Sequence, residues 1–348
     1  MSKSVLIVGA GGFIGGFIAE EALRRGYDTW CGVRESTSRR YLADGRLQFI
    51  TLDYDNPERL RAQLDGKRWD YIVYNLGATK CVNFMDFSRV NYGYLRDFTE
   101  ALIEVGAVPG KMVYMSSLSA IGPGDEKGYT PLSDDSVPRP NTRYGLSKIK
   151  AETFLQGLPK EFPWVILRPT GVYGPHEQDY LMMIKTIDSH LDVGVGFRRQ
   201  MLTFIYVEDL ARAIFDALER APIHKKYIVS EPKAYTQRDF RRIVSGVLGR
   251  RLVVPLRLPL WVLKAVCKVS EKWGAAKMKA VTLNTDKYNI MAQRNWDCDT
   301  TPAQRDWGFS PRVGLEEGIR LTVEAYRQEL ACETANQHNK HSSEKANE

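Results

Sequence analysis

The chain has 348 residues, of which 43% are hydrophobic and 26% charged, and its formal net charge is +7. This composition is ordinary for a globular protein with a sizeable core, in one large domain or two closely packed ones. The excess positive charge is spread along the chain without a recognised nucleic-acid-binding motif, so we expect no nucleic-acid partner.

The cysteine pattern and the hydropathy of the chain exclude further classes. The five cysteines are scattered, odd in number and without a C-x-x-C spacing, which argues against a disulfide framework and against a metal site. The chain has no uninterrupted run of about 18 apolar residues, so we expect no transmembrane span. Its N-terminus lacks a convincing secretory signal. These features predict a cytoplasmic protein that binds no metal.

The first predicted element is a strand at residues 4–9, a continuous apolar run typical of a strand buried on both faces. It leads into the turn Gly9-Ala10-Gly11-Gly12-Phe13-Ile14-Gly15 and an amphipathic helix that ends near residue 25. Glycines at this spacing let the backbone approach a pyrophosphate, which the free N–H groups of the helix then bind. The context predicts a dinucleotide site, with a plain tight turn as the alternative.

Five further apolar runs predict strands at residues 28–34, 47–52, 69–75, 111–116 and 163–168. Helical patterns separate most of them, notably at 86–105 and 144–157. Strands that alternate with helices form βαβ units and a parallel sheet. We therefore expect an α/β fold, with a Rossmann-type doubly wound sheet in residues 1–170.

The pattern becomes irregular after residue 168. Short runs at 204–206 and 227–229 predict strands that return to the sheet, so that 204–230 belongs to the dinucleotide-binding domain. Segments 236–248, 260–273 and 314–330 are helical in pattern. We expect a smaller, mostly helical substrate domain built from 171–203 and 231–330. Residues 333–348 are polar without apolar periodicity, which predicts a disordered tail.

The ends of the second and third strands bear on the type of dinucleotide. An NAD site usually has an acidic residue after the second strand, whereas this chain has Arg34, whose guanidinium can pair with a 2′-phosphate. We favour NADP for this reason, and NAD bound through Glu35 is the alternative. Asp53, beside Tyr54 at the end of the third strand, is a candidate acceptor for the adenine amino group.

Tyr144 and Lys148 carry the strongest catalytic signal, because residues four apart share one face of a helix. The lysine ammonium can stabilise a phenolate there and lower the tyrosine pKa from about 10 toward neutrality. A tyrosine of that kind exchanges a proton with an alcohol or a carbonyl near physiological pH. Beside a dinucleotide site, this pair indicates hydride transfer.

These motifs resemble the extended short-chain dehydrogenase/reductase family over residues 4–330. The resemblance rests on the glycine turn, Asn75-Leu76-Gly77-Ala78, Ser116-Ser117, Tyr144-x-x-x-Lys148 and Arg168-Pro169-Thr170-Gly171-Val172-Tyr173-Gly174-Pro175. It implies that Tyr144 is the general acid/base, that Lys148 binds the nicotinamide ribose, and that Ser117 hydrogen-bonds the reacting oxygen. Ser116 and Ser119 are the alternatives to Ser117.

The resemblance also implies which residues surround the cofactor. Leu76, Gly77 and Ala78 would line it behind the fourth strand, and Pro169 and Val172 would pack beside the nicotinamide. Asn91 matches a family asparagine that supports the site. By the same resemblance we expect a homodimer formed by the helices at 86–105 and 144–157.

The substrate is less clearly encoded. Family members that act on nucleotide sugars usually have Asn at the position of Gly171 and Arg where this chain has Leu202 and Thr203. Residues 258–269, apolar at helical spacing with a row of lysines, resemble the branch of 3β-hydroxysteroid dehydrogenases and dihydroflavonol reductases. We expect hydride transfer on a hydrophobic alcohol or ketone; a nucleotide-sugar epimerase that retains its cofactor is the alternative. This helix either contacts a membrane surface or is an ordinary amphipathic helix.

Overall fold

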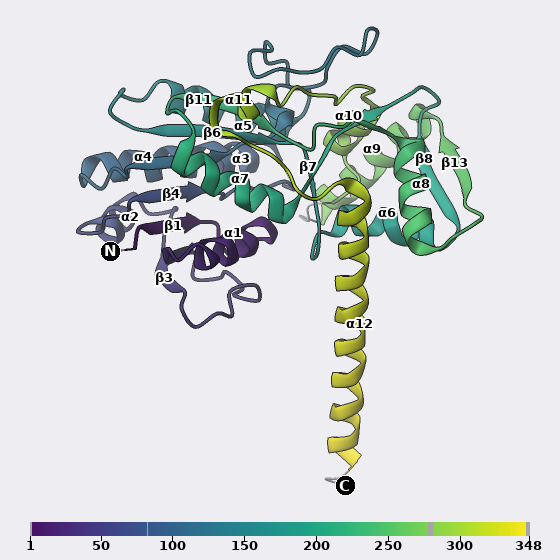
Figure 1. The fold of residues 1–348 in the computed structure, drawn as a ribbon, viewed down its shortest axis with the longest axis horizontal. Helices are drawn as coiled ribbons and strands as arrows, with labels where there is room; N and C mark the ends of the chain where they lie inside the picture. The colour runs from purple at the N-terminus through teal and green to yellow at the C-terminus, as the bar shows by residue number, and fades with distance from the viewer. Residues whose placement is uncertain (1, 82, 278–280, 346–348) are drawn as a thin grey trace.

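The computed structural model describes residues 2–81, 83–277 and 281–345, and its largest element is a seven-stranded sheet (Figure 1). The strand order is β11-β6-β5-β4-β1-β2-β3, and all neighbouring strands are parallel. The strands are β1 (Ser4–Val8), β2 (Asp28–Val33), β3 (Gln48–Thr51), β4 (Tyr71–Tyr74), β5 (Lys111–Met115), β6 (Trp164–Pro169) and β11 (Lys225–Val229). The prediction of an α/β fold with a doubly wound parallel sheet is confirmed.

The strand order reverses between β1 and β4. From β1 the chain moves outward through β2 to β3, and from β4 it moves the other way through β5 and β6. The connections that follow β1 and β4 therefore diverge and leave a crevice beyond the carboxyl ends of these strands. Open α/β sheets bind their ligands in such a crevice.

Helices cover both faces of the sheet, and those that pack on it are α1 (Phe13–Arg24), α2 (Pro57–Leu64), α4 (Tyr94–Glu104), α5 (Arg143–Gln156) and α7 (Val207–Arg220) (Figure 1). α1 and α7 share one apolar cluster with the sheet, which includes Ile18 and Ile214. α2, α4 and α5 share the other, which includes Leu60 and Phe98. With both faces covered, the strands read as continuous apolar runs, which is why the sequence located them well.

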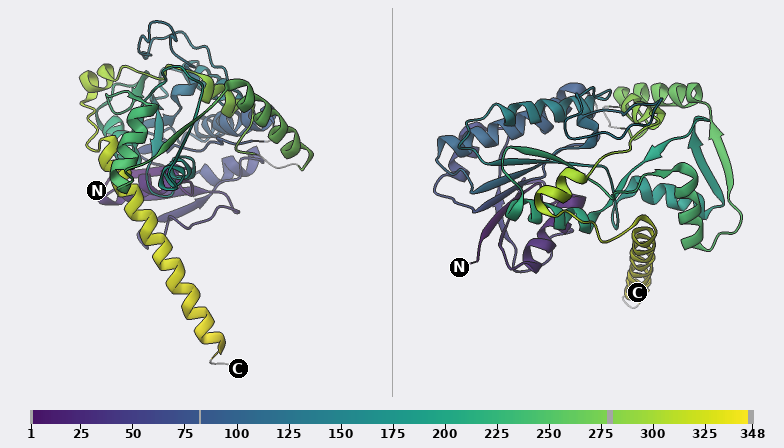
Figure 2. Two further views of the ribbon diagram at one scale, coloured as in Figure 1. Left: turned by 90° about the vertical axis from the view of Figure 1, so that its right-hand side faces the viewer. Right: turned by 45° about the horizontal axis from the view of Figure 1, so that its top comes forward.

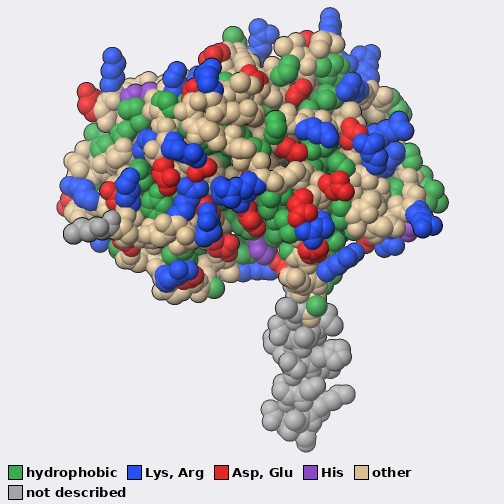
Figure 3. Space-filling model, viewed as in Figure 1, with side chains coloured by type: hydrophobic (Ala, Val, Ile, Leu, Met, Phe, Trp, Pro, Cys, Tyr) green, Lys and Arg blue, Asp and Glu red, His purple; other side chains and the backbone are tan. Residues whose placement is uncertain are grey.

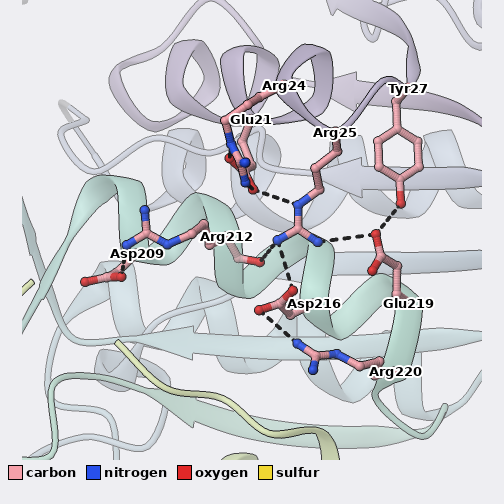
Figure 4. Close-up of polar contacts among 9 residues, drawn as sticks. All are labelled: Glu21, Arg24, Arg25, Tyr27, Asp209, Arg212, Asp216, Glu219 and Arg220. Atoms are coloured by element: carbon pink, nitrogen blue, oxygen red, sulfur yellow. Dashed lines mark hydrogen bonds and ion pairs between the residues drawn. The ribbon is translucent and has the colours of Figure 1, made fainter. Parts of the chain in front are cut away.

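An ion-pair cluster joins α1 to α7 (Figure 4). The guanidinium of Arg25, which follows α1, lies 2.6 Å from the carboxylate of Glu21 and 2.9 Å from that of Asp216 on α7. The Tyr27 hydroxyl donates to Glu219 of α7 over 2.6 Å. Since α1 begins at the glycine turn, these contacts hold in place the helix whose N-terminus points at the crevice.

The smaller part of the molecule lies beside the carboxyl ends of the strands (Figure 2). Its elements are β7 (Gly171–Tyr173), α6 (Gln178–Asp188), β8 (Leu191–Val195), β9 (Met201–Leu202), β10 (Phe204–Tyr206), β12 (Tyr235–Thr236), α8 (Gln237–Leu248), β13 (Val254–Leu258), α9 (Leu260–Ala276) and α10 (Thr285–Ala292). The strands pair as β10-β7, β12-β9 and β13-β8. Tyr173, Phe204 and Phe240 form the centre of its apolar core.

The predicted strand at 204–206 exists but has a different partner. β11 joins the main sheet beside β6, whereas β10 pairs with β7. β7 begins two residues after β6 ends and no longer belongs to the main sheet, so β10 extends a separate two-stranded sheet. Three apolar residues indicate a buried strand, but they contain no information about which strand lies next to it.

The C-terminal segment also differs from the prediction. After α11 (Thr301–Trp307), helix α12 (Leu315–Lys345) continues through most of the segment 333–348 expected to be disordered, and it projects from the body of the molecule (Figure 1). We expected disorder because the segment lacks apolar periodicity. That periodicity indicates whether a helix packs against a core, not whether the segment is helical. The same residues include Glu, Ala, Gln and Lys, which favour a helix without packing.

Within the described residues, no helix is both long and apolar enough to cross a membrane. On the face shown in Figure 3, basic and acidic side chains are interspersed, so the net positive charge does not gather there into one patch.

Candidate active site

A cavity of about 720 Å³ lies between the two parts of the molecule, at the carboxyl ends of β1, β4, β5 and β6. Most of the site residues predicted from the sequence line it. These are Gly9, Gly12, Phe13, Ile14, Arg34, Tyr54, Leu76, Gly77, Ser117, Tyr144, Lys148, Pro169 and Val172. Gly15, Asp53 and Ala78 do not belong to the lining.

The glycine turn is too tight for larger side chains. A Cβ on Gly9, whose φ is +83°, would lie 2.7 Å from the backbone nitrogen of Leu76. A Cβ on Gly15 would lie 2.4 Å from the carbonyl oxygens of Gly9 and Ala10. Gly15 therefore shapes the turn from behind the cavity wall, allowing α1 to pack against the end of β1.

The N-terminus of α1 suits an anion. Its N-cap is Gly12, no side chain caps the first N–H groups, and its first turn contains no acidic residue. Free N–H groups and the positive end of the helix dipole then face the cavity. This environment fits the pyrophosphate of a dinucleotide.

The loop after β2 brings a basic residue to the same end of the cavity. Arg34 lines the cavity together with Ser36, Thr37 and Ser38, whereas Glu35 does not. The backbone N–H of Arg34 donates to Thr37 Oγ1 over 3.0 Å, which closes the loop. The end of β2 thus offers a guanidinium and hydroxyls to the cavity, and Glu35, the alternative acidic ligand, is outside the lining.

Besides Gly15, two predicted cofactor contacts lie outside the lining, Asp53 and Ala78. The carboxylate of Asp53 pairs with Arg59 at 3.1 Å, and its backbone N–H donates to Gln63. Its neighbour Tyr54 does line the cavity. The N–H of Ala78 donates to Asn91 Oδ1 over 2.7 Å. This hydrogen bond of Ala78 orients the loop after β4.

Tyr144 lies in the first turn of α5, which begins there because the Thr142 hydroxyl accepts from the Gly145 N–H over 2.9 Å. Its hydroxyl interacts with Ser117, which lies two residues after the end of β5. Burial raises the pKa of Tyr144 to about 12, and the hydrogen bond with Ser117 opposes this rise only in part. At neutral pH the phenol is therefore protonated.

Lys148 lies one turn further along α5 and is buried. Its ammonium donates to the Met115 carbonyl over 2.7 Å and lies 5.9 Å from the centre of the Tyr144 ring. Burial lowers the pKa of Lys148 to about 7, although the Glu152 carboxylate opposes this shift. The expected lowering of the tyrosine pKa is therefore not found here, because the lysine is only partly charged and interacts with a carbonyl.

A buried polar network supports these residues. The Glu152 carboxylate, one turn after Lys148, accepts from Ser116 over 2.5 Å and forms two hydrogen bonds with Arg168, of 3.0 and 2.6 Å. Arg168 and Glu152 are 1% and 0% exposed. The network fixes α5 against the ends of β5 and β6. Ser116 is engaged in this network, Ser117 acts on the Tyr144 hydroxyl, and Ser119 also lines the cavity.

Asn91 connects the two central loops of the site. The helix predicted at 86–105 is divided into α3 (Phe84–Ser88), a π-helical turn (Arg89–Gly93) and α4. Within this turn the Asn91 amide donates to the Ala78 carbonyl over 3.0 Å and to Ser147 Oγ over 2.8 Å. π turns are frequent at functional sites, and this one ties the loop after β4 to helix α5.

The other end of the cavity is lined by charged residues that the sequence analysis did not identify. Lys80 and Lys287 lie 3.0 and 2.9 Å from the two oxygens of Asp179. Asp286, on α10, accepts from the Tyr144 N–H over 3.2 Å and pairs with Arg143. These residues come from four distant segments, so no local pattern pointed to them.

Gly171 has a structural partner. A Cβ at this position would lie 2.2 Å from the hydroxyl of Tyr180, on α6. The tyrosine thus occupies the space into which a larger side chain at 171 would project. Gly171, which differs from the Asn usual in nucleotide-sugar enzymes, therefore leaves the room that the Tyr180 side chain occupies.

The glycine turn and the Ser117, Tyr144 and Lys148 cluster thus meet in one cavity, at the crevice of a doubly wound sheet. The model of the NAD dependent epimerase/dehydratase family matches residues 5–230, and the chain belongs to this family.

Individual relatives are distant. The chain is 23% identical to a ceramide reductase of Caulobacter vibrioides, over 93% of this chain and 94% of that protein. It is 22% identical to a 3beta-hydroxysteroid-dehydrogenase/decarboxylase of Arabidopsis thaliana, over 94% of this chain and 62% of that protein. The crystal structure of a UDP-glucose 4-epimerase from Thermotoga maritima superposes with a TM-score of 0.74, at 20% identity, over 94% of this chain and 99% of that one. At such identities the structural likeness shows the fold alone.

Proposed function

We propose that the protein transfers hydride between a nicotinamide dinucleotide and a secondary alcohol or ketone with a hydrophobic body. The observation that carries the proposal is the convergence of Ser117, Tyr144 and Lys148 on one cavity with the glycine turn. The uncapped start of α1, with Gly9 and Gly12 in the cavity lining, fits the pyrophosphate of such a cofactor.

The residues divide the chemistry between them. When bound, the nicotinamide supplies or accepts the hydride. The Ser117 and Tyr144 hydroxyls hold the substrate oxygen, and the protonated phenol donates its proton as a carbonyl is reduced. In the reverse direction the tyrosinate takes the proton of the alcohol. Lys148, with its pKa near neutrality, supplies positive charge beside the phenolate whenever it is protonated.

We assign the 2′-phosphate of NADP to Arg34. This side chain lines the cavity at the end of β2, whereas Glu35, which would bind the ribose of NAD, does not. Arginine binds phosphate through two parallel hydrogen bonds, a geometry that a ribose hydroxyl does not require.

The hydrophobic body of the substrate is inferred from two lines of support. The relatives named for ceramide and for 3β-hydroxysteroids act on molecules with large apolar bodies. In this chain, Tyr180 fills the space at Gly171, where family members that act on nucleotide sugars usually have Asn.

A nucleotide-sugar epimerase is the second candidate. The charged side chains of Lys80, Asp179 and Lys287 at the substrate end favour it, because they offer partners for a polar substrate. An epimerase returns the hydride to the same substrate, so its cofactor shows no net change and stays bound.

Absorbance at 340 nm separates the two candidates. Purified protein is incubated with NADPH or NADH and a 3-ketosteroid, a long-chain ketone or a UDP-sugar. The proposal predicts net oxidation of NADPH with an apolar ketone. Conversion of the UDP-sugar without a net change in absorbance, by protein that co-purifies with its cofactor, would overturn the proposal in favour of the epimerase.

A further inference from the structure

Helix α9 exposes two parallel rows of side chains that the proposed chemistry does not use. Trp261, Val269 and Trp273 follow one another at multiples of four residues and are 73%, 69% and 68% exposed. The opposite side of the helix buries Leu263 and Cys267 against Val195 and Leu258. Large exposed apolar side chains in such a row mark an interaction surface.

The second row on α9 is basic. Lys264, Lys268 and Lys272 are exposed and also follow at intervals of four residues, beside the aromatic row. The only acidic residue of the helix is Glu271, which turns inward and pairs with Arg143 at 2.5 Å. The outward face of α9 therefore combines tryptophans with a row of lysines.

The sheet next to α9 continues the apolar surface. Leu191 pairs with Val254 and Val193 with Leu256, and all four are exposed. Because side chains alternate along a strand, they share a face with Val195 and Leu258, the pair that α9 covers. α9 thus covers one end of this sheet face and leaves the other end open beside it.

Two loops, one after β8 and one before β13, also carry an exposed apolar residue next to arginines. Phe197 follows β8, precedes Arg198 and Arg199, and is 76% exposed; Leu252 follows Arg250 and Arg251 and is 72% exposed. We call the outward face of α9 and the open face of β8 and β13, with these two loops, the α9–β13 surface.

We propose that the α9–β13 surface docks on an anionic phospholipid bilayer. Helices that lie in a membrane interface carry tryptophan and other apolar residues on one side and lysines on the other. The apolar side chains insert among the headgroups, and the basic residues are attracted to negatively charged lipids. Since no described helix spans a membrane, the contact is peripheral.

Charge favours a bilayer over a second copy of the chain as the occupant. A two-fold dimer brings the same patch of both copies together, so the lysine rows would face each other. An anionic bilayer neutralises them instead.

The position of the surface relative to the cavity adds a functional consequence. α9 packs on α10 through Leu263 and Tyr288, and α10 lines the substrate end of the cavity with Asp286, Lys287 and Ile290. If the proposed function is right, docking places the substrate end next to the lipid phase. The docking itself does not depend on the activity and is tested without it.

Co-sedimentation with vesicles tests the proposal. The full chain is mixed with vesicles of phosphatidylcholine alone or of phosphatidylcholine with phosphatidylserine, at low and high salt. We expect binding to the anionic vesicles that weakens at high salt, and a blue shift of tryptophan fluorescence on binding. The variants are Trp261→Ser with Trp273→Ser, and Lys264→Glu with Lys268→Glu and Lys272→Glu. Each set is expected to lower the partition coefficient by about tenfold or more.

Matched controls separate docking from general effects. Val137→Ser removes a side chain that is 72% exposed elsewhere, and Lys67→Glu with Lys127→Glu and Lys160→Glu changes the net charge equally at other exposed positions. Both controls should bind like the wild type, and thermal melting verifies that every variant is folded. Absence of wild-type binding, or an equal loss in the controls, would overturn the proposal. So would a dimer in light scattering that only the α9 variants dissociate.

Discussion

One end of the cavity includes the glycine turn with Gly9 and Gly12 and the uncapped start of α1, while the other end includes several charged side chains. Asp179 and Lys287 line this second end and form an ion pair with each other. Under the proposed function, the first end holds the cofactor by close approach of main-chain groups, which requires glycine at fixed places in one short segment. The second end would hold the substrate through side chains from distant segments, which can change without altering the turn. Tyr144 lies between the two ends, so substitutions that act on one end alone test whether the ends have separate roles.

The largest effect is expected from Tyr144→Phe. It removes the proton donor and leaves both ends of the cavity intact, so turnover should fall by about a thousandfold or more. NADPH affinity, measured by fluorescence titration, should stay within a factor of a few. Retained turnover would remove the acid/base role from Tyr144, and lost cofactor binding would mean that the site had been disrupted.

The next effect, confined to the cofactor end, comes from Gly15→Ala. The added Cβ would lie 2.4 Å from two carbonyl oxygens, so the turn must open and cofactor affinity should fall by about a hundredfold. Gly45→Ala is the matched control, because a Cβ there meets no atom within 4 Å. Isothermal titration with NADPH compares the two variants. Equal affinity in both would show that the turn does not hold the cofactor.

Lys148 links the centre of the site to pH-dependent stability. Burial lowers its pKa from 10.5 to about 7, so in this window the unfolded chain binds a proton that the folded chain does not. The contribution of Lys148 to the free energy of unfolding is therefore highest above the pKa of the unfolded chain. It decreases as the pH falls and is lost as the pH passes through about 7. Relative to Lys148→Met, the wild type should gain about 1.4 kcal/mol of unfolding free energy per pH unit between these limits. Urea unfolding of both proteins measures this difference, and a difference that does not change with pH would mean that Lys148 stays charged.

The smallest effect is expected from Arg34→Asp, again at the cofactor end. Removing the guanidinium and placing a carboxylate near the ribose should shift the ratio of kcat/KM for NADPH over NADH by about tenfold or more toward NADH. Arg39→Asp, an exposed neighbour outside the cavity lining, controls for general charge. An unchanged ratio would remove Arg34 from the site.

The sequence located the cofactor half of the molecule because its signals are local. The six strands predicted up to residue 168 agree with the structure to within two residues at each end, and the glycine turn lies between β1 and α1 as expected. A strand buried on both faces leaves a continuous apolar run, and a turn that needs glycine shows it directly.

The features that the sequence did not predict depend on contacts between segments that are far apart in the chain. The three apolar residues of β10 gave its position but not its partner β7, and the π turn at Asn91 is invisible in a helical pattern. Lys80, Asp179 and Lys287 meet across more than two hundred positions of the chain. The proximity of Tyr144 and Lys148 was predictable, but the balance between burial and charge that sets their pKa values was not.

Hydride transfer itself is tested by following deuterium from NADPH, labelled at C4 of the nicotinamide, into an apolar ketone. Mass spectrometry of the product is compared for the wild type and Tyr144→Phe. The wild type is expected to give an alcohol labelled at the carbinol carbon, and the variant is expected to give no labelled alcohol. Unlabelled ketone from the wild type, together with a UDP-sugar that is converted without net loss of label from the cofactor, would contradict this expectation.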